Sequence, residues 1–439
     1  GCFADYYHWK DGIGKNRPKG LNLQWGGEES NEFGTDEFLR FCSKVGAEPY
    51  ICVNVGSGSP SEACQWVEYC NRIGNSYYVK LREENGHPEP YNVRYWGVGN
   101  ELWGCGGFFD PTAYAQEYRR FASFMSRVDP SIQLVACGHV TKGLFMVGRR
   151  EWNLRFMEAM RDYTFLMNNL SLHYYFHGYG GDIDFTDEDY YSLLCDIQNL
   201  EYEIKRAIEI VDFFAEERRD VGIIIDEWGT WYPQATVENG LYQQNTLRDA
   251  ILAASCFNLF NEYSGKLVMA NIAQMVNVLQ SLFLTKGPQA VLTPTYHVFD
   301  MYKDHMGNKA LKVDVESPVL FEPPPPKDTH PWMPLRKPKP LYSLNASASL
   351  KEEEEVVLTL VNSRVDEEME TEIAILGNRT IREGYATVLT SNRTRDYNDF
   401  DTPNLVKPVQ ERLEVKEKSA RFTYIAPVHS VNSLLLKLE

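Results

Sequence analysis

The sequence lacks the signatures of several common protein classes. Its 439 residues contain no Gly-x-Gly-x-x-Gly turn, no Cys-x-x-Cys pair and no run of 18 apolar residues. These absences argue against a dinucleotide-binding sheet, a zinc site and a transmembrane helix, respectively. Positive charge is also scarce, with 44 Lys and Arg against 61 Asp and Glu and a formal net charge of -17. Such a charge disfavours nucleic acid and anionic membranes as partners.

The cysteines do not follow a disulfide framework. There are nine of them, an odd number, and their spacing is irregular. We therefore expect mostly free, buried thiols in a reducing compartment, which favours the cytoplasm. The chain opens on Gly1-Cys2-Phe3-Ala4, which is neither an initiator nor a signal peptide. We expect it to begin inside a structured element, so that any targeting segment lies outside the sequence and secretion stays open.

The first 310 residues alternate between apolar runs typical of strands and segments with helical periodicity, which predicts parallel strands with right-handed crossovers. Seven strands are predicted, at 1–4, 49–55, 93–101, 132–137, 170–175, 221–227 and 267–273. Helices are predicted at 36–45, 61–73, 111–128, 152–160, 188–218, 240–263, 274–284 and 294–306. Because a closed barrel of this type has about eight strands, we expect an α/β fold, a (β/α)8 TIM barrel over residues 1–310, whose first strand precedes residue 1.

After residue 310 the pattern of apolar and polar residues changes. A second domain is expected there, because the chain is too long for one core. Residues 311–340 are rich in proline and are predicted to form a linker or extended loop. From residue 341 to 439 the apolar segments become short and alternating, with turn residues between them. This pattern predicts a C-terminal antiparallel β-sandwich, with strands at 356–361, 369–375, 385–389, 421–424 and 431–438.

Two of the predicted strands end in a glutamate. Glu101 closes the run 95–101 and Glu227 closes the run 221–227, and each has a tryptophan one or two residues later. A single glutamate in such a place is more often an ordinary surface residue. The carboxyl ends of barrel strands meet at one face, however, so we expect these two side chains to converge as the paired carboxylates of a glycosidase. A separation of about 5–5.5 Å gives retention of configuration and one of about 6.5–9.5 Å gives inversion, and the sequence leaves this choice open.

The same stretches resemble glycoside hydrolase family 51, the α-L-arabinofuranosidases. Residues 95–104 are similar to the acid/base motif of that family, and residues 226–232 to its nucleophile motif. Further similar motifs follow in order: Gly1-Cys2-Phe3, His8-Trp9-Lys10-Asp11-Gly12-Ile13-Gly14, Leu172-His173-Tyr174-Tyr175, Ala270-Asn271-Ile272-Ala273-Gln274 and Leu292-Thr293-Pro294-Thr295-Tyr296-His297. Several motifs in register are far more specific than an Asn-Glu pair alone.

The resemblance implies roles for individual residues, with Glu101 as acid/base and Glu227 as nucleophile. The other implied residues support this pair or bind substrate: Asn100 at the arabinose 2-OH, His173 beside the acid/base, Tyr175 on the nucleophile, Gln274 and Cys2 at the sugar, and Trp25 and Trp231 at the aglycone. Each of these has a plainer explanation when taken alone. Tryptophan and cysteine are commonly core residues, a lone buried histidine is usually structural, and Asn100 could simply close a strand.

The resemblance therefore implies a retaining, exo-acting α-L-arabinofuranosidase that acts on arabinoxylan, arabinan or their oligosaccharides. It implies no metal and no organic cofactor, and it suggests homo-oligomers, often hexamers. Two alternatives remain open. One is an endo-β-1,4-glucanase or xylanase of the same family, which needs an open cleft, and the other is a barrel that binds carbohydrate without cleaving it.

Overall fold

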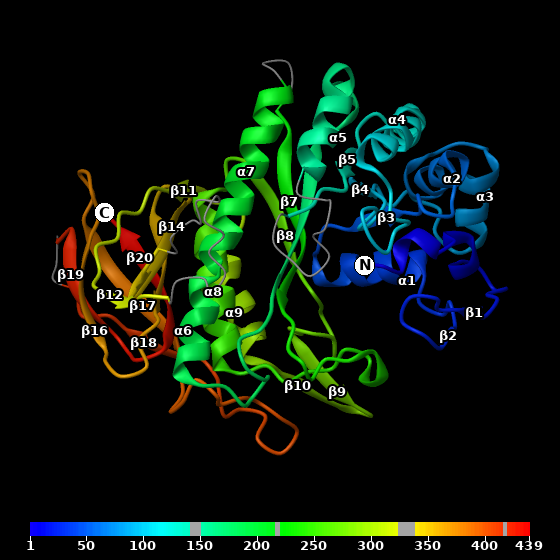
Figure 1. Ribbon diagram of the computed structural model, residues 1–439. Coiled ribbons are helices and arrows are strands. Elements are labelled where there is room, and N and C mark those ends of the chain that lie inside the picture. Colours follow the sequence, from blue (N-terminus) through cyan, green and yellow to red (C-terminus); the bar gives the residue numbers. More distant parts are fainter. Residues whose placement is uncertain (141–150, 216–219, 324–338, 416–418) are drawn as a thin grey trace, which may run out of the picture. The chain divides into compact units, whose positions relative to one another are not determined.

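The computed structural model describes residues 1–140, 151–215, 220–323, 339–415 and 419–439 (Figure 1). The chain forms two compact units. The first comprises Gly1–His173 and Glu203–Glu227, and the second comprises Tyr174–Tyr202 and Trp228–Glu439. The predicted domain boundaries at residues 310 and 340 stay predictions. Among the described residues, no helix combines the length and apolar character needed to cross a membrane.

A sheet of six strands in sequential order carries the N-terminal fold. The strands are β3 (Tyr50–Val53), β4 (Tyr95–Val98), β5 (Gln133–Ala136), β6 (Asn169–Phe176), β7 (Gly222–Thr230) and β8 (Leu267–Ile272). The pairs β3–β4, β4–β5 and β5–β6 are parallel. All six lie where the alternation of apolar runs predicted them. Burial of Ile223, Ile224 and Ile225 explains why the run 221–225 contains no polar side chain.

The helices between these strands also follow the prediction, except that the helix predicted from residue 240 begins at Leu247. They are α1 (Thr35–Val45), α2 (Pro60–Asn71), α4 (Pro111–Val128), α5 (Trp152–Met160), α6 (Asp187–Cys195), α7 (Ile197–Ala215), α8 (Leu247–Glu262) and α9 (Pro294–Tyr302). The start of α4 shows why: Asp110 accepts a hydrogen bond from the Thr112 amide, and Pro111 occupies the first turn. The predicted helix 188–218 is two helices, which break at Asp196, and residues 216–218 lie outside the described part. Helix α3 (Tyr77–Glu84) was not predicted.

Two predicted elements are wrong. Residues 1–4 do not form a strand, because the amide of Ala4 bonds to the carbonyl of Gly1 in a turn and Ala4–Tyr6 is a short 3-10 helix. Residues 274–284 do not form a helix. Asn277 and Leu279 have φ values of 60° and 51°, in the left-handed region that a right-handed helix excludes. The segment leads instead into a hairpin of β9 (Phe283–Lys286) and β10 (Gln289–Leu292).

The C-terminal segment is antiparallel, as predicted. One sheet has the order β11 (Lys309–Leu311), β14 (Leu344–Lys351), β15 (Glu355–Asn362), β20 (Ser430–Leu438), β17 (Ile381–Leu389) and β18 (Val409–Arg412). A second sheet pairs β16 (Met369–Ala374) with β19 (Arg421–Ala426). The two sheets share one apolar core, in which Ile373 and Phe422 join Leu358 and Leu436. Strands β12 (Val319–Phe321) and β13 (Leu341–Tyr342) pair at either end of the proline-rich segment, whose residues 324–338 lie outside the described part.

A buried polar cluster joins helix α8 to this sandwich within the second unit. Oδ1 of Asn258 accepts hydrogen bonds from the hydroxyls of Tyr302 and Thr359, both at 2.8 Å. It also accepts one from Ser347, at 2.8 Å, while its Nδ2 donates to Asn345 at 2.7 Å. One amide thus satisfies four polar groups, three of them hydroxyls, in a largely buried region.

We predict that Asn258→Ala lowers the free energy of unfolding by about 2–3 kcal/mol, because it leaves buried hydroxyls unpaired. Denaturant unfolding followed by circular dichroism measures the change. Asn261→Ala is the matched control on the same helix, since Asn261 makes one hydrogen bond, to Ser347. Equal losses for the two variants would contradict the prediction.

Candidate active site

Three ionisable side chains meet just beyond the end of β4 and in the C-terminal halves of β6 and β7. Nδ1 of His173 lies 2.8 Å from Oε1 of Glu101 and 3.5 Å from Oε2 of Glu227. One carboxylate oxygen of each glutamate lies within 4.8 Å of the other and of the imidazole. The structure therefore brings the two selected glutamates and the selected histidine together, within the first unit. Ion pairing with the imidazole accounts for the cluster, and we assign no metal to it.

The backbone around Glu101 has an unusual conformation that presents its side chain. Gly99 has a φ of 81° and Glu101 a φ of 45°, so the chain turns sharply after β4. A Cβ atom on Gly99 would come within 2.1 Å of Cδ2 of Leu102, so only glycine fits. The carbonyl of Glu101 accepts hydrogen bonds from the amides of Gly104 and Gly106, at 2.7 and 3.1 Å. These bonds hold a non-glycine residue in a conformation that it rarely adopts.

Asp5 fixes the same turn from outside the sheet. Its Oδ1 accepts hydrogen bonds from the amides of Val55 and Gly56, at 2.8 and 3.0 Å, just beyond β3. Its Oδ2 accepts from the amide of Asn100 at 2.6 Å, just beyond β4. Burial raises the pKa of Asp5 to about 6, although these amides act in the opposite direction. One carboxylate therefore ties the ends of two neighbouring strands together, directly before Glu101.

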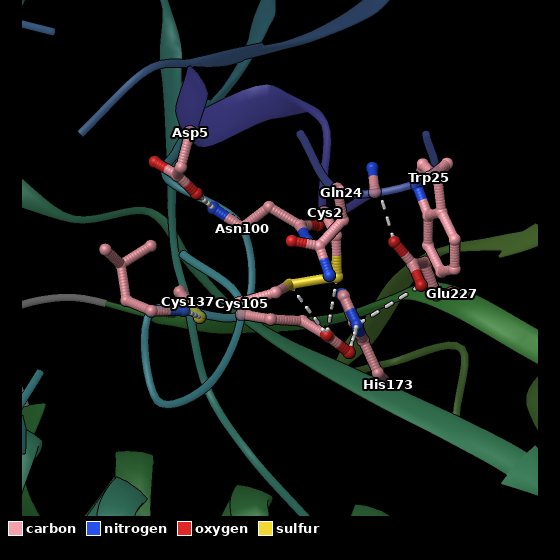
Figure 2. Close-up of a disulfide and its surroundings, with 12 residues drawn as sticks. Cys2, Asp5, Gln24, Trp25, Asn100, Cys105, Cys137, His173 and Glu227 are labelled. Atoms are coloured by element: carbon pink, nitrogen blue, oxygen red, sulfur yellow. Dashed lines mark hydrogen bonds and ion pairs between the residues drawn. A yellow bond between two sulfur atoms is a disulfide. The ribbon is translucent and has the colours of Figure 1, made fainter. Parts of the chain in front are cut away.

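A disulfide bond lies against Glu101, and it is the exception to the expectation of mostly free cysteines, which the other seven confirm. Cys2 and Cys105 are bonded to each other, whereas the other seven cysteines are free. Both sulfur atoms lie 3.3 Å from Oε2 of Glu101. Since a disulfide carries no S–H group, these are van der Waals contacts and not hydrogen bonds. Figure 2 shows the bond with Asn100, Trp25, His173 and Glu227 around it. Cys2 thus lies at the site as expected, but as half of a disulfide.

The carboxylates around His173 favour its protonated, positively charged form. Its side chain is 8% exposed, and this burial lowers its pKa. The negative charges of Glu227 and Asp226, together with the contact with Glu101, raise it by more, so that the pKa of His173 lies well above its usual range. A cation among three carboxylates offsets the repulsion that they would otherwise exert on one another.

Asn100 and Trp25 are the remaining predicted residues of the first unit. Asn100 is 7% exposed, and its Nδ2 has no hydrogen-bond partner among the described residues. A buried amide without a partner is available to a ligand hydroxyl. Trp25 is half-buried, in a turn where the side chain of Asn22 accepts a hydrogen bond from its amide.

Tyr175, Trp231 and Gln274 belong to the second unit. The rings of Tyr175 and Trp231 meet edge to face, with centroids 5.4 Å apart. The indole of Trp231 donates to the carbonyl of Ala235 at 3.1 Å. Gln274 is exposed and its amide bonds to the carbonyl of Val278. These three residues keep their implied roles as predictions.

Sequence reasoning gave no role to three residues that the structure places at the site. Asp5 and Cys105 carried no signal, because neither lies in a strand. Asp226 directly precedes Glu227, and the alternation of side chains along a strand assigns the two to opposite faces. In the structure they contact different sides of one imidazole ring, since Oδ1 of Asp226 lies 3.0 Å from Nε2 of His173. The adjacency of two carboxylates at a strand end was the signal that could have found Asp226.

Comparison with known proteins now connects this geometry to a family. Residues 2–180 match the model of the α-L-arabinofuranosidase 1 domain, and residues 226–430 match that of the α-L-arabinofuranosidase C-terminal domain. An intracellular exo-α-L-arabinofuranosidase of Bacteroides ovatus is 38% identical over all of this chain and 82% of its own length. The chain belongs to glycoside hydrolase family 51, the α-L-arabinofuranosidases.

Solved structures of family 51 have the same fold. The arabinofuranosidase of Xanthomonas axonopodis pv. citri is 33% identical, with a TM-score of 0.87 over 99% of this chain and 85% of its own. That of Thermotoga maritima, solved as an arabinose complex, is 30% identical, with a TM-score of 0.84 over 100% and 86%. The predicted barrel with a C-terminal sandwich and the predicted glycosidase activity are confirmed. The family 51 neighbours support this activity over an endoglucanase, a xylanase or a non-catalytic barrel. The expected strand before residue 1 stays a prediction.

We predict that Asp5→Asn lowers kcat about tenfold and the free energy of unfolding by about 1–3 kcal/mol. With Oδ1 kept on Val55 and Gly56, the new amide group directs N–H donors at the amide of Asn100, which displaces the turn before Glu101. Steady-state kinetics and denaturant unfolding measure both effects. Asp11→Asn, in the same N-terminal segment, is the control and should change neither value. An Asp5→Asn enzyme with the kcat of the wild type would show that the turn does not need this carboxylate.

Proposed function

We propose that the chain is a retaining, exo-acting α-L-arabinofuranosidase in which Glu227 is the nucleophile and Glu101 the acid/base. The observation that supports this best is the separation of the pair, with one oxygen of each carboxylate within 4.8 Å of the other. Retaining enzymes keep their carboxyls about 5–5.5 Å apart, whereas inverting enzymes leave about 6.5–9.5 Å for a water molecule. The side chains are 16% and 18% exposed, so that both can reach a bound sugar.

In the first step Glu227 attacks the anomeric carbon of the arabinofuranosyl group while Glu101 protonates the oxygen that leaves. A covalent arabinosyl ester forms on Glu227. In the second step Glu101 takes a proton from water, which attacks the same carbon and releases arabinose with its configuration retained. The His173 imidazolium lies against both carboxylates, so that it stabilises the negative charge that moves from Glu227 to Glu101 during the first step.

The other selected residues bind the substrate in this proposal. The unpaired Nδ2 of Asn100 donates to the sugar 2-OH, a contact that strengthens as the oxocarbenium-like transition state forms. The family resemblance implies that Trp25 and Trp231 offer flat aromatic faces to the aglycone, that Gln274 contacts the sugar ring and that Tyr175 supports the nucleophile. Cys2 touches the sugar through its disulfide sulfur. The natural substrates are arabinoxylan, arabinan or their oligosaccharides.

We also propose a cytoplasmic location and a homo-oligomeric state, with the hexamer as the form to test first. Seven free cysteines and the name of the Bacteroides relative support the location, whereas the Cys2–Cys105 disulfide counts against it. The oligomer rests on family resemblance alone. Cell fractionation tests the first proposal and light scattering coupled to size exclusion tests the second.

We predict that Glu227→Ala lowers turnover of an aryl α-L-arabinofuranoside to nearly zero, because no covalent intermediate can form. Glu101→Ala keeps the nucleophile, so that azide restores turnover of a substrate with a good leaving group and yields an arabinosyl azide of retained configuration. Product NMR identifies the azide. The control is Glu117→Ala, which removes a glutamate that pairs with Arg120 on the outside of α4. Full activity of Glu227→Ala would refute the assignment.

The mode of action needs a separate measurement on a natural polymer. We predict that the wild-type enzyme releases free arabinose from arabinoxylan and leaves the length of the xylan backbone unchanged. Product chromatography and viscometry of the same digest measure the two quantities. A shortened backbone would favour an endo-acting enzyme.

A further inference from the structure

His173 is contacted by carboxylates at both of its ring nitrogens. Nδ1 faces Glu101 at 2.8 Å, and Nε2 faces Oδ1 of Asp226 at 3.0 Å. The second contact is close but poorly aligned for a hydrogen bond, so we describe it as an ion pair. A neutral imidazole has one N–H group and one lone pair, and here the lone pair would face a carboxylate whichever tautomer formed. The proximity of a carboxylate to each nitrogen therefore favours hydrogen on both.

Asp226 is itself held by a residue of β3, the first strand in the sheet order. The hydroxyl of Tyr50, on β3, donates to Oδ2 of Asp226 at 2.9 Å. Tyr50 reaches this carboxylate because β4 carries no side chain at Gly97. A Cβ atom there would lie 2.7 Å from the Tyr50 oxygen and 3.2 Å from its ring. The first glycine of the Tyr-Trp-Gly-Val-Gly-Asn-Glu motif therefore leaves the space that the Tyr50 side chain occupies.

A chain of contacts results that joins four strands: Tyr50 of β3, Asp226 of β7, His173 of β6 and Glu101 after β4. All four side chains belong to the first unit, and their exposure is low, with 14% for Asp226 and 8% for His173. Charge alternates along the ionic part of this chain, from carboxylate to imidazolium to carboxylate. Each side chain orients the next one, and only Glu101 takes part in the proposed proton transfer.

We propose that Asp226 and Tyr50 are positioning residues for the acid/base step, which hold His173 as a doubly protonated donor directed at Glu101. This inference rests on the proposed role of Glu101. His173 keeps both of its protons throughout the reaction. The proton that Glu101 gives to the leaving oxygen is replaced from the attacking water, so the proton count balances without the imidazole.

The electrostatic surroundings of His173 agree with this assignment. Glu101 faces the ring from the loop after β4, and Asp226 and Glu227 face it from β7. The other titratable groups around this cluster are Tyr50, which donates to Asp226, and the free thiol of Cys52, both on β3. The main-chain nitrogen of Gly1 lies 3.4 Å from Oε1 of Glu227. Asp226 is the one carboxylate of the three that has no part in the proposed bond-making steps. Its negative charge is therefore constant while the charges on the other two change.

We predict that Asp226→Asn lowers kcat between about 10- and 100-fold, as is usual for a group that orients a reacting side chain, with KM changed less than twofold. Without the charge of Asp226 the pKa of His173 falls, so the variant loses activity at a lower pH than the wild type as the pH rises. Tyr50→Phe should lower kcat by a smaller factor. Because Tyr50 acts through Asp226, adding Tyr50→Phe to Asp226→Asn should cause no further loss.

The control variants remove a similar tyrosine–aspartate hydrogen bond outside the site. Tyr69 of α2 donates to both oxygens of Asp36 at 2.9 Å, and both residues are buried. Tyr69→Phe and Asp36→Asn should lower stability without moving the pH profile. Nitrogen NMR of histidine-labelled enzyme gives a direct readout, and His305, whose pKa burial lowers to about 4, serves as an internal neutral reference. Both nitrogens of His173 should be protonated at pH 7.5 in the wild type but not in Asp226→Asn.

Three outcomes would overturn the proposal. They are a singly protonated His173 in the wild type at pH 7.5, an Asp226→Asn variant whose pH profile matches that of the wild type, or independent losses in the double variant. If the Asp226 variant does not fold, Gly97→Ala displaces Tyr50 without removing a polar group and should reproduce the effect of Tyr50→Phe. Failure of azide rescue in Glu101→Ala would reject the proposed acid/base and leave the NMR result standing, so the two failures can be told apart.

Discussion

The ion pair between His173 and Glu101 is the contact on which the rest of the site depends. Three carboxyl groups with exposures of 14–18% converge on one imidazole. Its Nδ1 faces Glu101 and Glu227 and its Nε2 faces Asp226, so that a positive charge on the ring offsets their mutual repulsion. Because each carboxylate approaches from a strand end, the parallel sheet is what makes the arrangement possible, since it delivers the carboxyl ends of neighbouring strands to one edge.

The backbone must then hold Glu101 in place against its own preference. A glutamate with a φ of 45° is uncommon, and three separate features support it here. Gly99 allows the turn, the amides of Gly104 and Gly106 bond to the carbonyl of Glu101, and Asp5 binds the amide of the preceding residue. Conformational strain at this residue is therefore balanced by hydrogen bonds that are made entirely within the first unit. Such support is common where a side chain must be presented at a fixed angle.

Prediction from the sequence succeeded where a local pattern of residues determines the structure. Apolar runs located all six strands, and the helix predicted at 111–128 matches α4 at both ends. Prediction failed where long-range contacts decide. The amide of Leu279 bonds to the carbonyl of Leu241, and buried Gln280 bonds to the amide of Thr230, and these partners draw the segment 274–284 away from a helix. The disulfide joins cysteines 103 residues apart, a pairing that no spacing rule could select.

The two oxygens of Glu101 have different surroundings, and this difference bears on where its proton resides. Oε1 lies 2.8 Å from Nδ1 of the charged imidazole and accepts its N–H group. Oε2 lies between the two disulfide sulfurs, which offer it no hydrogen. A proton on Oε1 would compete with the imidazole N–H for the same position, whereas a proton on Oε2 meets no donor. In the proposed reaction, Oε2 is therefore the oxygen of Glu101 that is left without a donor. Two thiols in the same place would each offer it a hydrogen, so the disulfide removes two potential donors from the proposed acid/base.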